Sequence, residues 1–106
     1  MGTHLTPLEV CEALIGPLDR IAAILGHHAK SPYHWRRASA IREAGDLPSL
    51  RIVRQLLEHS DAHGLGLLPE HLIFGATRAE IDALLALPPG QRPSPTALPP
   101  AEDAAA

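Results

Sequence analysis

IAAILGHHAKSPYHW, residues 21–35, is the segment on which the interpretation of the whole chain depends. The small Ala22 would let two helices approach closely, and Gly26, four residues later, would make a tight turn between them. Trp35, nine residues after Gly26, would then anchor the second helix in the core. This spacing is the skeleton of a helix-turn-helix, and it predicts a second helix with one face left free.

Start and stop signals on both sides of this segment predict further helices. Thr6 and Glu9, and again Thr77 and Glu80, have the spacing of a capping box at a helix start. No segment alternates apolar and polar residues with a period of two, so we expect no strand. The predicted helices are 7–15, 17–25, 31–43, 49–63 (opened by Pro48 or Ser49), 69–74 and 77–86. The expected fold class is all-α, a compact domain of five to six helices.

Length and composition predict one domain followed by a tail. The chain has 106 residues, and its end, residues 87–106, is dominated by proline and alanine. Such a segment buries little apolar surface, so we expect it to be disordered. The predicted domain is therefore residues 5–86, with a core of aliphatic side chains because aromatic residues are few.

Charge is distributed unevenly along the chain. The net charge is −3, yet residues 27–55 hold six Lys and Arg against two acidic residues, a local charge of +4. The remaining residues hold three basic against ten acidic side chains, a charge of −7. A basic segment on an acidic body is typical of a face that meets phosphate, although a solvated surface has the same composition.

The groove geometry of helix-turn-helix proteins then suggests roles for individual residues. The start of the recognition helix, which we place at about 31–43 in the major groove, reads base edges, and neighbouring cations bind phosphate. The candidates for reading bases are Lys30, Ser31, Tyr33, His34 and Arg37. The candidates for binding phosphate are His28, Arg36, Arg42, Ser49 and Arg51. Tyr33 has an alternative place in the core, because the fold has few other aromatic residues.

Other chemistry has little support in the sequence. His59 and His63 are four residues apart on one helix face, a spacing that can hold zinc, but no third ligand is fixed by spacing. We therefore expect no metal site and no cofactor. We expect Cys11, the only cysteine, to be a small buried apolar residue. No phosphate loop, serine elbow or carboxylate pair is present, so we do not expect an enzyme.

Three stretches give the chain a resemblance to a known family. Residues 21–26, 33–37 and 44–49, together with Arg51, resemble the small Cro/YdaS-like regulators of prophages and alphaproteobacterial genomes. The similarity covers roughly residues 7–75, and a weaker one links the chain to activators of gene transfer agents. His27 and Pro32 stand where the family has β-branched apolar residues. Because proline breaks a helix interior, we expect the third helix to begin at residue 31 or 32, after a longer connector.

The resemblance implies a sequence-specific regulator of transcription that binds double-stranded DNA. Two-fold symmetry would make it a homodimer, and the last helix, residues 77–86, would either form the dimer contact or close the core. The alternatives are an adaptor or activator that binds RNA polymerase or another regulator, and the antitoxin of a toxin–antitoxin pair. With no apolar segment long enough for a membrane span and no signal peptide, we expect a cytoplasmic protein.

Overall fold

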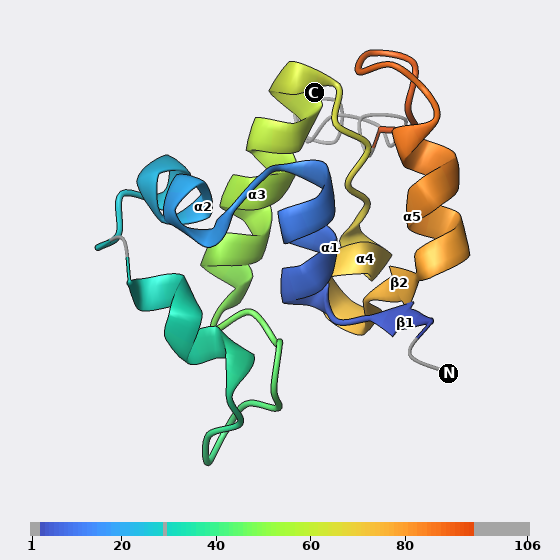
Figure 1. Cartoon of the computed structure of the whole chain (residues 1–106). Coiled ribbons are helices and arrows are strands. Elements are labelled where there is room, and N and C mark those ends of the chain that lie inside the picture. The colour runs from blue at the N-terminus through green and yellow to red at the C-terminus, as the bar shows by residue number, and fades with distance from the viewer. Residues whose placement is uncertain (1–2, 29, 95–106) are drawn as a thin grey trace, which may run out of the picture.

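Helices make up nearly all of the regular structure in residues 3–28 and 30–94, the part of the chain that a computed structural model describes (Figure 1). The predicted all-α class is therefore confirmed. The helices are α1 (Pro7–Leu14), α2 (Leu18–Leu25), the 3-10 helix η1 (Ser31–Arg36), α3 (Leu50–His63), α4 (Pro69–Phe74) and α5 (Arg78–Leu85). Two short strands, β1 (His4–Leu5) and β2 (Ala76–Thr77), join the two ends of the fold.

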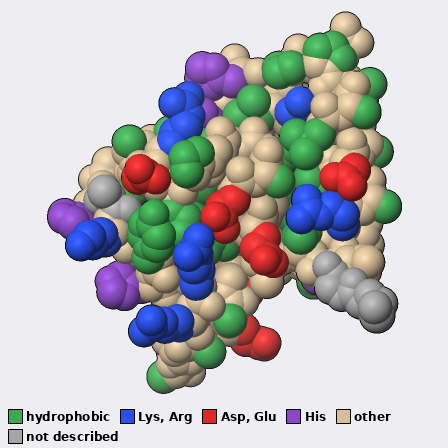
Figure 2. All heavy atoms as spheres, in the orientation of Figure 1, with side chains coloured by type: hydrophobic (Ala, Val, Ile, Leu, Met, Phe, Trp, Pro, Cys, Tyr) green, Lys and Arg blue, Asp and Glu red, His purple; other side chains and the backbone are tan. Residues whose placement is uncertain are grey.

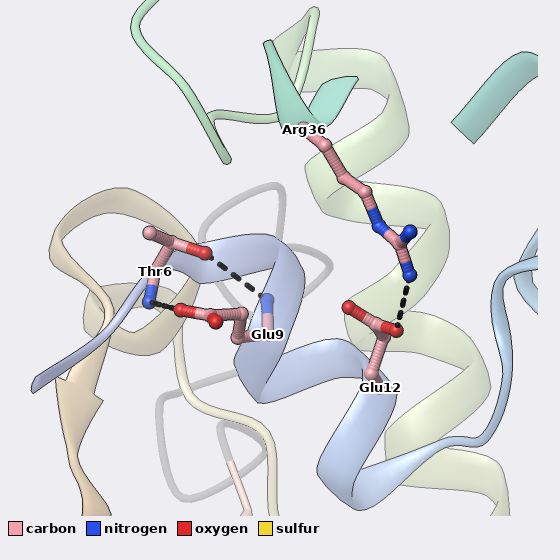
Figure 3. Close-up of polar contacts among 4 residues, drawn as sticks. All are labelled: Thr6, Glu9, Glu12 and Arg36. Carbon is pink, nitrogen blue, oxygen red and sulfur yellow. Dashed lines mark hydrogen bonds and ion pairs between the residues drawn. The ribbon is translucent and has the colours of Figure 1, made fainter. Parts of the chain in front are cut away.

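The helix boundaries follow from local hydrogen bonds at the caps. The Thr6 hydroxyl accepts from the Glu9 amide at 3.2 Å, and the Glu9 carboxylate accepts from the Thr6 amide at 2.9 Å (Figure 3). The same reciprocal capping box opens α5 at Thr77. Gly64 ends α3 with φ 65°, a left-handed conformation that glycine adopts without steric cost. These predicted starts and stops are confirmed.

One α-helix, α1, lies at the centre of the fold. It packs against α4, α5 and α2, and its residues Leu8, Val10 and Cys11 are almost completely buried (Figure 1). The rest of the core is aliphatic, with Trp35 as its one aromatic member among the described residues. Ile81 of α5 is also fully buried, so this helix closes the core with one face.

The expectation of no strand was wrong. β1 and β2 form an antiparallel pair with the register His4 to Thr77 and Leu5 to Ala76. Each strand has only two residues, which is too short for an alternating pattern to be seen in a sequence. The pair ties the start of the chain to the segment between α4 and α5.

The predicted helix over residues 31–43 was also wrong in its extent. The helix is a 3-10 helix that ends at Arg36, and Arg37 is already extended, with φ −110° and ψ 147°. The Trp35 carbonyl accepts a hydrogen bond from the Gly45 amide at 2.7 Å, which pulls the chain back toward η1. Residues 36–44 have good intrinsic helix propensity, so this tertiary contact overrides local preference.

The predicted tail begins later than residue 87. The Gly90 amide donates to the Gly64 carbonyl at 2.9 Å, and the Arg92 guanidinium donates to the Leu65 carbonyl at 3.1 Å. Residues 87–94 therefore pack against the end of α3, and the folded unit reaches at least residue 94. The remainder of the predicted disordered tail, residues 95–106, lies outside the described residues. No helix in the described part is both long and apolar enough to cross a membrane.

Candidate functional site

The three residues predicted to form a helix-turn-helix lie in α2, the connector after it and the 3-10 helix η1. Ala22 is fully buried, and Gly26 has the left-handed φ of 73° that the turn requires. The His27 amide closes the turn by donating to the Ala22 carbonyl at 2.9 Å. Trp35 is 6% exposed and lies edge-on to the His27 ring at 6.2 Å between centroids. The three motif residues thus hold η1 against α2.

The 3-10 geometry of η1 sorts its side chains into rows. Side chains three residues apart lie above one another in a 3-10 helix. With the residue before and after the helix included, the rows are Pro32 and Trp35; Lys30, Tyr33 and Arg36; and Ser31, His34 and Arg37. The first row is buried, so the other two rows face outward. These two rows contain all five residues predicted to read bases.

Three of those five residues surround one hollow of about 420 Å³. Lys30, Tyr33 and His34 line it together with Asp19, which comes from α2. Tyr33 is 44% exposed, so the alternative that it belongs to the core is wrong. Figure 2 shows Lys, Arg and His side chains gathered at the left and lower left, over the region of η1 in Figure 1. The hollow therefore combines the aromatic ring of Tyr33, the amine of Lys30, the imidazole of His34 and the carboxylate of Asp19.

Arg36, predicted to bind phosphate, makes contacts within the protein. Its guanidinium forms an ion pair with Glu12 of α1 at 3.4 Å (Figure 3) and lies 5.1 Å from the centroid of the Tyr33 ring. A cation over an aromatic face is attractive, so this contact orients Tyr33 as well as Arg36. Glu12 was not singled out in the sequence, because nothing local links it to η1.

Two other residues predicted to bind phosphate form hydrogen bonds with the protein main chain instead. The Arg42 guanidinium donates to the carbonyls of Trp35 and Arg37, at 3.4 and 3.3 Å. The Ser49 hydroxyl accepts from the Ile52 amide at 3.3 Å and caps α3, as the sequence predicted for this helix start. Both side chains therefore stabilise the local conformation of the chain around η1 and the start of α3.

Of the remaining predicted phosphate ligands, one lies in the connector and one on α3. The His28 ring accepts from the Lys30 amide at 3.2 Å, which shapes the connector. Arg51 is exposed and lines a hollow of about 310 Å³ together with His27. Arg51 thus extends the basic surface from η1 to the first turn of α3.

The histidine pair on α3 does not gather further ligands. The rings of His59 and His63 lie 4.4 Å apart between centroids. Burial lowers the pKa of His59, and the neighbouring His63 and Arg20 lower it further. Within residues 3–28 and 30–94, no three metal-binding side chains cluster.

The second perturbed histidine has a structural role. The ring of His71 accepts a hydrogen bond from the Leu68 amide at 3.1 Å and caps α4. Burial lowers the pKa of His71, while Glu70 and Glu80 act in the opposite direction. The neutral ring that accepts this bond is thus the form that the fold favours.

Cys11 gives a direct test of the packing of α1. It is fully buried, and desolvation, assisted by Glu12, raises the pKa of its thiol to about 12. The thiolate is the reactive form, and a pKa raised from 9.0 lowers its population by about a thousandfold. We expect Ellman's reagent at pH 8 to leave Cys11 unmodified in the native protein and to modify it fully in urea. Fast stoichiometric reaction without urea would contradict this packing.

The chain matches no family model, no curated protein and no solved structure. The resemblance to Cro/YdaS-like regulators therefore stays a prediction.

Proposed function

We propose that the protein is a sequence-specific regulator of transcription that binds double-stranded DNA with the face formed by η1 and its flanking residues. The observation that supports this most is the convergence of Lys30, Tyr33 and His34 in one hollow. These side chains stand on an element that the buried Trp35 fixes to the core. A rigid element that presents hydrogen-bonding side chains is what reading of base edges requires.

The acidic residues near the hollow favour a contact with DNA bases over a contact with the DNA phosphates alone. Asp19 lines the hollow and would repel a phosphate placed there, and Arg36 is already paired with Glu12. A carboxylate in such a place accepts a hydrogen bond from the amino group of cytosine. Phosphates would instead be bound by exposed cations outside the hollow, such as Arg51. We reassign Arg37 from base reading to phosphate binding, because it is exposed and does not line the hollow.

The proposal includes a cytoplasmic homodimer. Two copies related by a two-fold axis would place their η1 elements at half-sites one helical turn apart. Leu85, at the end of α5, and Leu87, just beyond it, are exposed large apolar residues that could form this contact. Ile81, one turn before Leu85, packs into the core, so the contact would involve only the end of the helix.

Retention of genomic DNA tests the proposal. Purified protein is incubated at moderate salt with sheared DNA from its own genome, and the retained fragments are sequenced. We expect a few sharp peaks upstream of genes. Uniform retention would mean sequence-blind phosphate binding, and no retention would overturn the proposal in favour of a protein partner.

A single substitution tests the face that we assign. Arg37→Ala should weaken binding to a retained fragment about tenfold and lower the slope of log affinity against log salt by about one, since one phosphate contact is lost. Arg78→Ala is the matched control, because Arg78 is an exposed arginine on α5 that pairs with Asp82 at 3.9 Å. Fluorescence anisotropy at several salt concentrations measures both. Equal loss in the two variants would remove η1 from the interface.

A protein-binding adaptor is the second candidate, and an apolar surface between the start of α3 and α4 favours it. Leu50 and Ile73 line a hollow of about 280 Å³ whose lining is mostly apolar but includes Asp46 and Ser49, and Phe74, next to Ile73, is 72% exposed. Apolar side chains grouped in this way are typical of contacts with RNA polymerase, another regulator or a toxin. Alanine at both Arg36 and Arg37 separates the candidates, because an adaptor would keep its function without them.

A further inference from the structure

We propose that the turn between η1 and α3 acts as a wing that enters the minor groove of DNA, with Ile41 inserted as an apolar wedge at a base step. The proposal rests on the proposed DNA-binding function and adds a second contact to it. It concerns residues 37–43, which we call the wing. None of the residues predicted to read bases, apart from Arg37 at its start, belongs to this segment.

Ile41 is the most exposed large apolar residue in the described part of the chain. It is 94% exposed, at a position where the chain reverses between Ser39 and Arg42. Single exposed apolar residues are common on proteins, so exposure alone does not assign a role. We infer its role from the hydrogen bonds that hold the turn in place and from the residues beside Ile41.

The wing is braced from the side of η1. The Ser39 amide donates to the Arg42 carbonyl at 2.7 Å, and the Arg42 amide returns a bond to the Ser39 carbonyl at 3.4 Å. The Arg42 guanidinium donates to the carbonyls of Trp35 and Arg37. Because Trp35 is buried, these bonds link the turn to the core, and Ile41 projects from a supported loop.

The far side of the wing is tied down as well. The Gly45 amide donates to Trp35, and the Gly45 carbonyl accepts from the Leu8 amide of α1 at 3.0 Å. Figure 1 shows the segment between η1 and α3 extending beyond the other elements at the lower end of the molecule. A braced projection of this kind can enter a groove without the rest of the protein moving.

The chemistry of the wing fits a narrow, negatively charged groove. Ala38, Ser39 and Ala40 beside Ile41 are small and uncharged, and Arg37, Arg42 and Glu43 at the base of the turn give the wing a net charge of +1. The minor groove is about 6 Å wide and attracts arginine, and isoleucine is among the side chains that unstack a base step there. Because the Arg42 guanidinium is held by backbone carbonyls, the exposed Arg37 is the cation that would meet the groove, and its charge beside an apolar tip favours DNA over a protein surface as the partner.

Unstacking of a base step provides the test. The probe is a duplex of about 30 base pairs taken from a genomic fragment that the wild-type protein retains, with 2-aminopurine in place of adenine at each TpA step in turn. We expect wild-type protein to raise the fluorescence at one step. Ile41→Ala should abolish that rise and weaken binding about tenfold, and Ile41→Leu should preserve both.

Ile73→Ala is the matched control, because Ile73 is also an exposed isoleucine, 53% accessible, but lies on α4. It should bind and unstack DNA like the wild type, and circular dichroism should show all variants folded. If Ile41→Ala keeps the fluorescence rise and the affinity, the wing proposal is overturned, DNA binding stands, and Ile41 is left for a protein contact. If the wild-type protein retains no DNA, both proposals are overturned.

Discussion

Replacing Trp35 with alanine is expected to lower the free energy of unfolding by about 3–5 kcal/mol. The side chain is buried in an otherwise aliphatic core, and its removal leaves a cavity that α2 and η1 fill only partly. Alanine retains the main-chain carbonyl that accepts from Gly45 and Arg42, but it loses the side chain that fixes this carbonyl against the core. Because a domain of this size is stable by only about 5–15 kcal/mol, the variant should be marginally folded.

Urea unfolding followed by circular dichroism measures the loss, since fluorescence would report on the residue that is removed. Tyr33→Ala is the control, because Tyr33 is an exposed aromatic residue two positions away on η1. It should change the unfolding free energy by less than about 1 kcal/mol, yet weaken DNA binding if the hollow is the binding surface. A Trp35→Ala variant as stable as Tyr33→Ala would show that η1 is not anchored through this side chain.

The helices were predictable where their signals are local. Thr6 and Glu9 are three residues apart, and the bonds that they exchange are complete within one turn of helix, so the sequence contains everything needed. The same holds for Gly64, whose left-handed conformation ends α3. Burial of Ala22 and Trp35 also followed from their spacing around Gly26, which places one small and one large residue where the two elements meet.

The features that were missed depend on partners far away in the sequence. The end of η1 at Arg36 is set by Gly45, and the strands exist only because His4 meets Thr77. In the candidate site, the residue types on η1 were predictable, but the pairing of Arg36 with Glu12 was not, since 24 positions separate them. Intrinsic propensity favoured a helix through residue 43, and long-range hydrogen bonds overrode it.

Gly75 is the position where a single methyl group should do the most harm. Its φ of 76° and ψ of −160° lie in a region that only glycine adopts readily. A β-carbon placed there would also collide with the backbone carbonyl of Leu5, which is part of β1. Since neither backbone can yield without breaking the β1–β2 pair, Gly75→Ala should cost about 3 kcal/mol or more.

Gly26→Ala separates the two causes of that cost. Gly26 also has a left-handed φ, 73°, but no atom lies within 4 Å of a β-carbon built there. This variant should therefore lose only the conformational term, about 1–2 kcal/mol. At about 4–8 °C per kcal/mol, thermal melts should place Gly75→Ala at least about 12 °C below the wild type and Gly26→Ala about half as far. Equal melting temperatures would mean that Leu5 does not pack against Gly75, and the pairing that joins the start of the chain to α5 would then have to be abandoned.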